Sequence, residues 1–116
     1  GEEKKIIPVL LDEVLLGKRV DLIKIDTQGA ELRVIKGAIR LIKQNPNLNI
    51  MMEFCPIGIK KVGDNPLEIL TLLKSLGFTA RLIETGKMIS FEKLSKIKEQ
   101  ESLNLLLSRV LVENQG

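Results

Sequence analysis

One ten-residue segment, Ile23 to Leu32 (IKIDTQGAEL), constrains the fold more than any other part of the chain. An apolar run ends in the carboxylate of Asp26, a glycine follows at Gly29, and helix-forming residues come next. This order predicts a buried strand, a tight turn and a helix, because glycine adopts dihedral angles that a Cβ forbids. Open α/β sheets bind ligands outside the carboxyl ends of their strands. Asp26 is therefore predicted to lie where such a sheet holds its ligand.

The rest of the chain predicts further strands and helices of a single α/β domain. The expected strands are 20–26, 49–55, 78–84, 88–90 and 103–113, with a short edge strand at 5–10. The expected helices are 13–16 after a cap at Asp12, 29–43, 66–76 after Asn65, and 91–100. A helix between the first two main strands makes them parallel through a right-handed crossover. The last strands are expected to finish the sheet as a terminal pair.

Two carboxylates at strand ends are the strongest candidates for chemistry. Asp26 ends strand 20–26, and Glu53 stands near the end of strand 49–55. Because neighbouring strands lie about 4.8 Å apart, the two carboxylates are expected to share one crevice, where either is suited to act as a general base. In the alternative interpretation, Asp26 caps the following helix and Glu53 pairs with a lysine.

The turn between the first strand and helix carries other polar groups. Thr27 and Gln28 offer donors and acceptors to a ligand, although Thr27 is equally well suited to cap the helix. Gly29 is required by either interpretation, because the chain turns sharply there. Glu31 falls in the first helical turn, where an acid is favoured by the helix dipole alone.

Composition excludes several classes of function. The chain has no histidine, which excludes His-based triads and His metal sites, so no metal is expected. Cys55 is the only cysteine, which rules out an internal disulfide and favours a reducing compartment. Its side chain is expected to be buried, and Lys60 and Lys61 are expected to lie in a solvated loop.

Charge and hydropathy exclude other partners. A net charge of only +3 and the absence of Tyr and Trp argue against nucleic acid. No apolar run approaches the roughly 18 residues of a membrane span. The acidic start at Gly1 to Glu3 is unlike a signal peptide, so a cytoplasmic protein is expected.

Residues 20–42 (VDLIKIDTQGAELRVIKGAIRLI), followed by 49–56 (NIMMEFCP), resemble the FkbM family of S-adenosylmethionine-dependent methyltransferases. That family shows a strand ending in K-I-D-x-E/Q-G-A-E, a helix containing L-K-G-A, and a next strand ending in an acid. VLLDEVL at 9–15 and LNLLLSRV at 103–110 resemble its flanking segments. The resemblance implies a Rossmann-like class I methyltransferase sheet with an antiparallel closing strand. It also implies methyl transfer from S-adenosylmethionine to a hydroxyl of a small molecule or glycan.

The family signature also implies roles for single residues. Asp26 matches its first acid, Gln28 the glutamate-or-glutamine position, Gly29 the turn and Glu31 the second acid, while Glu53 matches the acid of the next strand. The resemblance thus implies that Asp26 and Glu53 are catalytic. Cofactor binding is expected at four consecutive residues: Asp26, Thr27, Gln28 and Gly29. Gln28 lacks the charge that many members carry there.

Only residues 1–19 precede the first main strand, although the family places its glycine-rich cofactor half upstream. Residues 1–116 are therefore expected to form one α/β domain that resembles the C-terminal part of the enzyme, binds S-adenosylmethionine very weakly or not at all, and is inactive alone. The strand from Val20 to Asp26 would then expose an unpaired edge, which predicts a homo-oligomer through that edge. The alternatives are a non-catalytic α/β assembly or regulatory module, and a small independent ligand-binding domain.

Overall fold

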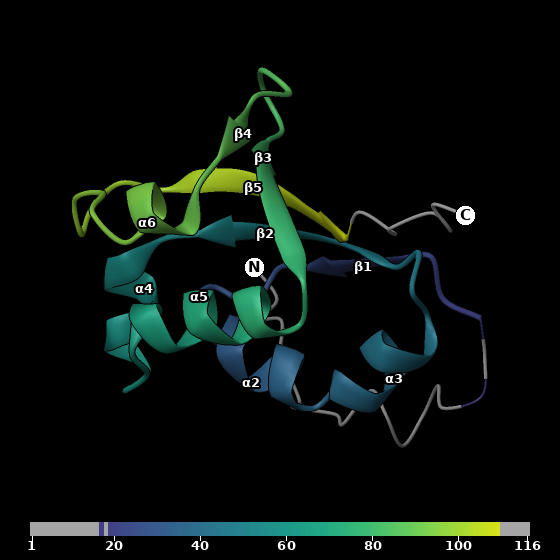
Figure 1. Ribbon diagram of the computed structural model, residues 1–116. Helices are drawn as coiled ribbons and strands as arrows, with labels where there is room; N and C mark the ends of the chain where they lie inside the picture. The colour runs from purple at the N-terminus through teal and green to yellow at the C-terminus, as the bar shows by residue number, and fades with distance from the viewer. Residues whose placement is uncertain (1–16, 18, 110–116) are drawn as a thin grey trace, which may run out of the picture.

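The computed structural model describes residue 17 and residues 19–109, which form a mixed five-stranded sheet with helices packed against it (Figure 1). The strands are β1 (Leu22–Ile25), β2 (Asn49–Phe54), β3 (Phe78–Leu82), β4 (Met88–Ile89) and β5 (Leu103–Arg109). The α/β class predicted from the sequence is confirmed. The segments expected at 5–10 and 13–16, and residues 110–113 of the last expected strand, lie outside the described residues.

The sheet has the order β1-β2-β5-β3-β4. β1 and β2 are adjacent and parallel, as predicted, and β5 runs antiparallel to both of its neighbours, β2 and β3. The expected terminal pair is wrong, because β5 inserts into the middle of the sheet and β3–β4 forms the far hairpin. The apolar side chains of β5 explain its central position. Leu105 and Leu107 are completely buried there, and an edge strand would not bury them to the same extent.

The helices are α2 (Glu31–Lys36), α3 (Ile39–Gln44), α4 (Pro56–Lys61), α5 (Pro66–Ser75) and α6 (Phe91–Leu94). The single helix expected at 29–43 is divided at Gly37, since glycine is a poor helix former. Pro56 ends β2 as expected, but it also begins α4, because proline fits the first helical turn. Lys60 and Lys61 therefore lie in a helix, not in a loop. The helix expected at 91–100 is only one turn long.

The core lies between the helices and one face of the sheet. Every second strand side chain points into it, and Figure 1 shows α2, α3 and α5 on that side. The best-buried strand and helix residues are Leu32, Ile35, Ile42, Ile50, Phe54, Ile69, Leu73, Leu105 and Leu107. Asn65 caps α5 as predicted, because its side chain accepts a hydrogen bond from Leu67 N at 2.9 Å. Glu68 does not complete a capping box and instead forms an ion pair with Lys36.

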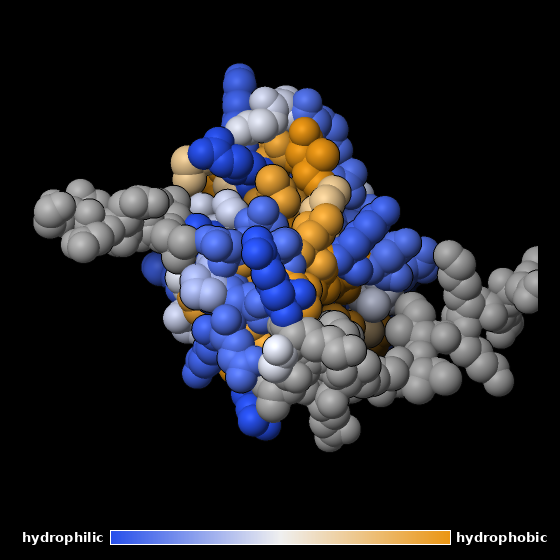
Figure 2. All heavy atoms as spheres, turned by 90° about the vertical axis from the view of Figure 1, so that its right-hand side faces the viewer, coloured by the Kyte–Doolittle hydropathy of each residue, from blue (hydrophilic) through white to orange (hydrophobic). Residues whose placement is uncertain are grey.

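The opposite face of the sheet is not covered by any helix of the described part of the chain. The sequence led us to expect strands buried on both faces, but Leu22 and Lys24 of β1 are exposed, whereas Ile23 is partly buried and Ile25 is buried. Seen from the side where β1 and β2 begin, Figure 2 shows hydrophobic atoms at the surface in the upper part of the molecule, between hydrophilic ones. Among the described residues, the sheet therefore has one face covered by helices and one face without a helix.

Candidate functional site

Asp26 and Glu53 line the same cavity at the carboxyl ends of the two parallel strands. Asp26 directly follows β1, and Glu53 is the penultimate residue of β2. The cavity has a volume of about 310 Å³ and opens on the uncovered face of the sheet; its other lining residues are Lys24, Ile25, Met51, Met52, Ile83 and Asn104. The two carboxylates that the sequence singles out are thus brought together.

Within the described residues, the side chains of Asp26 and Glu53 form no hydrogen bond or ion pair. Ala30 occupies the N-cap position of helix α2, and no side chain forms a capping hydrogen bond there. Neither Asp26 nor Thr27 therefore caps that helix. Glu53 does not pair with a lysine in this part of the chain either. Both carboxylates are exposed, and both are available to a ligand.

The carboxylate of Glu31 holds the turn that follows β1. Gly29 N donates to Glu31 Oε2 at 2.9 Å, and Thr27 Oγ1 donates to the same oxygen at 2.8 Å. Glu31 is 3% exposed and is the one buried charged side chain of the described residues. Hydrogen bonds to a charged group contribute about 1.5 to 3 kcal/mol each. Glu31 therefore does more than complement the helix dipole, because it fixes the path of the chain between Asp26 and α2.

Gly29 is required by backbone geometry and by close packing. Its φ is +116°, and the preceding Gln28 also has a positive φ, of 48°. A Cβ built on Gly29 would lie 2.4 Å from the carbonyl oxygen of Gly58 in α4. The turn therefore presses directly against the helix that follows β2, and this contact couples the ends of the two parallel strands.

A second hollow, of about 320 Å³, lies beside this turn. Glu53 lines both this hollow and the first cavity, and Gln28, Cys55 and Lys61 contribute polar or reactive groups. Cys55 is partly buried at the start of α4, where its side chain makes no capping bond. Gln28 and Gly29 thus face this hollow, while Thr27 lines neither cavity and is bound to Glu31.

Two residues at this end of the sheet were missed by the sequence analysis. Asn104 is the second residue of β5 and pairs with Glu53 in the register, and its Nδ2 donates to Glu84 Oε1 at 3.0 Å. That bond, followed by a backbone hydrogen bond, lowers the pKa of Glu84 from its usual value. Glu84 stands at the end of the expected strand 78–84, and this strand-end position could have identified it as a candidate site residue. Asn104 offered none, because its position depends on the insertion of β5 between β2 and β3.

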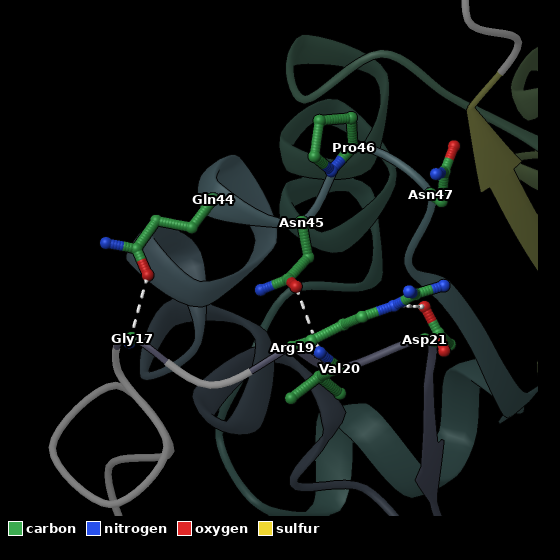
Figure 3. Close-up of a pocket in the computed structure, with 8 residues that line it drawn as sticks. All are labelled: Gly17, Arg19, Val20, Asp21, Gln44, Asn45, Pro46 and Asn47. Carbon is green, nitrogen blue, oxygen red and sulfur yellow. Dashed lines mark hydrogen bonds and ion pairs between the residues drawn. The ribbon is translucent and has the colours of Figure 1, made fainter.

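A cavity of about 580 Å³, larger than the two at the carboxyl ends, lies at the opposite end of β1 and β2 (Figure 3). Its polar groups are mostly engaged with one another. Asn45 Oδ1 accepts a hydrogen bond from Val20 N at 2.9 Å, and Gln44 Oε1 accepts one from Gly17 N at 3.2 Å. Arg19 pairs with Asp21 at 3.2 Å. These contacts fasten the segment before β1 to the end of α3, so they explain the position of β1 without a ligand.

A comparison with protein families decides the affiliation of the chain. The model of the methyltransferase FkbM domain matches residues 1–80, which include the turn, Asp26 and Glu53. The chain belongs to the FkbM methyltransferase family. The match ends within β3, so Glu84 and β5 lie beyond it. Neither the curated proteins nor the solved structures include a match to the chain.

The polar groups of the FkbM site suit the cofactor that the family resemblance implies. S-adenosylmethionine carries ribose hydroxyls and an ammonium group, and both are donors to carboxylates. Asp26 and Glu53 supply carboxylates at the cavity that have no partner among the described residues. The described residues contain no cluster of three or more His, Cys, Asp or Glu side chains that could hold a metal ion. Among the helices of residues 19–109, none has the length and hydrophobicity needed to cross a membrane.

Proposed function

We propose that this FkbM chain serves S-adenosylmethionine-dependent O-methylation of a hydroxyl group on a small molecule or glycan, on a Rossmann-like class I sheet. The observation that carries the proposal is the cavity shared by Asp26 and Glu53 at the ends of adjacent parallel strands. Its position agrees with the general rule for ligand sites in α/β sheets. The family match supports methyl transfer as the chemistry.

The two carboxylates take different roles in this proposal. S-adenosylmethionine supplies an electrophilic methyl group when it is bound. Asp26, held beside the rigid turn, accepts hydrogen bonds from the polar groups of the cofactor, and Gln28 and the backbone of Gly29 bound the same space. Glu53 faces both hollows and therefore stands between cofactor and acceptor, where it takes the proton of the acceptor hydroxyl.

We further propose that the 116 residues bind the cofactor weakly and do not catalyse methyl transfer alone. Ligand sites usually bury 70–90% of a ligand's surface. The 310 Å³ cavity is open toward the uncovered face, so the described residues supply one wall of such a site. Cys55, the single cysteine, is compatible with a reducing compartment, and we propose a cytoplasmic location.

Calorimetric titration with S-adenosylmethionine tests the role of Asp26. We expect weak binding to the wild-type chain and a further loss of about fivefold, or about 1 kcal/mol, in Asp26→Asn, because the amide oxygen still accepts a hydrogen bond but carries no charge. Asp21→Asn is the matched control, because Asp21 lies at the other end of β1 and lines the opposite cavity. Equal affinities of the two variants would contradict the assignment of Asp26. Tight, stoichiometric binding to the wild-type chain would contradict the proposal of weak binding.

The second candidate function is a non-catalytic assembly or regulatory module. The observation that favours it is the uncovered face of the sheet, which includes the exposed side chains of Leu22, Ile83 and Met88. Under this alternative, the chain shows no measurable affinity for the cofactor but associates with a protein partner. The same titration separates the two candidates, because the module would give no heat of binding with any variant.

A further inference from the structure

The uncovered face of the sheet carries side chains arranged in rows across the strands. Lys24, Met51, Leu106 and Arg81 are in register on β1, β2, β5 and β3, and we refer to them as the basic row. Two residues further along the same direction lies the acidic row, formed by Asp26, Glu53, Asn104, Ile83 and Glu84. Glu53 pairs with Asn104 in the register, and the backbone of Ile83 donates to Asn104 O.

This face has properties of a surface that is covered in use. All-parallel sheets occur almost only with both faces covered. The parallel pair β1 and β2 of this mixed sheet has one face free of described helices. Leu22 is 51% exposed, Ile83 42% and Met88 57%. The centre of the basic row is also apolar, because Met51 and Leu106 lie between Lys24 and Arg81, so charged groups flank apolar ones as they do in protein interfaces.

The charged groups of the face have few partners within the described residues. Lys24, Asp26 and Glu53 form no ion pair there, and Arg81 donates only to the carbonyl oxygen of Gly86. Asn104 holds Glu84 at the end of β3. The two rows thus carry opposite charges that are not neutralised within the described part of the chain.

We propose that this face binds a second copy of the same chain. Consider a two-fold axis that lies across the strands, between the basic and acidic rows. Rotation about it places each strand over its own copy, so that the acidic row of one chain faces the basic row of the other. Asp26 then meets Lys24 of the second copy, and Glu84 meets Arg81. Each contact occurs twice, as a two-fold interface requires.

The size of the face sets the strength of the association. Four strands of about six residues cover roughly 20 by 20 Å, or about 800 Å² for both copies. Stable interfaces bury about 1,200 Å² or more, so the dimer is weak and reversible. The edge of β1, which the sequence analysis predicted as the contact, is four residues long and buries less still. The site cavity lies beneath the contact, so the second copy and a ligand exclude each other.

Sedimentation at several protein concentrations, with charge-reversal variants, tests the proposal. Lys24→Glu and Asp26→Lys each replace two attractive contacts by repulsive ones, so we expect each variant to associate at least about tenfold more weakly. An equimolar mixture of the two variants should regain the wild-type affinity, because the glutamate introduced in one variant then meets the lysine introduced in the other. High salt should weaken the wild-type dimer. Lys43→Glu is the control, since exposed Lys43 lies in α3 on the helical side of the sheet.

A further variant distinguishes the face from the edge. Arg81 lies three strands from β1, roughly 14 Å away, so Arg81→Glu weakens a dimer formed through the face and leaves one formed through the edge unchanged. The proposal is overturned if the wild-type chain is monomeric at every concentration, as it would be if another segment of the same chain covered the face. It is also overturned if Arg81→Glu has no effect, or if the mixture of Lys24→Glu and Asp26→Lys does not associate.

Discussion

At the scale of single residues, Gly29 has the strictest requirement in the site. It combines a positive φ with a close approach to the carbonyl oxygen of Gly58. We expect Gly29→Ala to lower the free energy of unfolding by about 3 kcal/mol, because it adds backbone strain and a steric clash. Urea denaturation measures the change.

Gly58→Ala is the matched control for that substitution. A Cβ on Gly58 meets only Cys55 Cβ at 4.0 Å, and alanine is the better helix former within α4. Its free energy of unfolding should stay equal or rise by up to about 1 kcal/mol. Similar losses in both variants would show that the turn does not depend on the contact between Gly29 and Gly58.

The residues of the turn were only partly predictable. The sequence predicts the strand end at Asp26 and the glycine turn at Gly29, because local dihedral preferences determine both. From the sequence, Glu31 is predicted only to interact with the helix dipole. In the structure its carboxylate instead accepts hydrogen bonds from Thr27 Oγ1 and from the backbone N–H of Gly29. Whether an acid in a first helical turn faces solvent or the preceding loop depends on what packs above it. Here α4 encloses the turn, and α4 was not expected from the sequence.

At the scale of elements, Arg109 connects three of them. Its Nη2 donates to Ile42 O at 2.7 Å and to Asn45 O at 2.5 Å at the end of α3, and its guanidinium lies 4.9 Å from the ring centre of Phe78. Burial lowers its pKa from the usual value, and its Nε has no partner among the described residues. The last residue of β5 thus fastens the centre of the sheet to the helical layer.

We expect Arg109→Lys to lower the free energy of unfolding by about 1 to 2 kcal/mol. Lysine lacks the planar fork that reaches two carbonyl oxygens while stacking on an aromatic ring. Arg19→Lys is the control, because Arg19 forms only an exposed pair with Asp21 and should change stability by less than about 0.5 kcal/mol. Thermal or urea unfolding measures both changes. An equal effect of the two substitutions would contradict the role assigned to Arg109.

The order of elements was easier to predict than their arrangement. All five strands appear where apolar runs predict them, because strand formation follows local patterning. The place of β5 between β2 and β3 depends on contacts between distant segments, which a linear pattern does not contain. The division of α2 from α3 follows the weak propensity of Gly37, yet a single glycine does not always end a helix.

At the scale of the whole molecule, the candidate functional side chains lie at one end and on one face of the sheet. β1, β2 and β3 run in the same direction, so Asp26, Glu53 and Glu84 meet at a single edge. The family match supports the proposed methyl transfer, and the face without described helices fits the proposal that these residues form one wall of a site. The proposed association through this face and the proposed ligand binding at its cavity would therefore compete for the same surface.

The central claim is that the ligand binds at the carboxyl ends of β1 and β2. Amide chemical shifts of the isotope-labelled chain, followed during titration with S-adenosylmethionine, test it most directly. We expect saturable shifts concentrated at residues 26–29, at Glu53 and at Asn104. The opposite cavity, around Arg19 and Asn47, provides an internal control and should not respond. Shifts concentrated at that opposite cavity, or no shifts at the carboxyl ends at millimolar cofactor, would contradict the account.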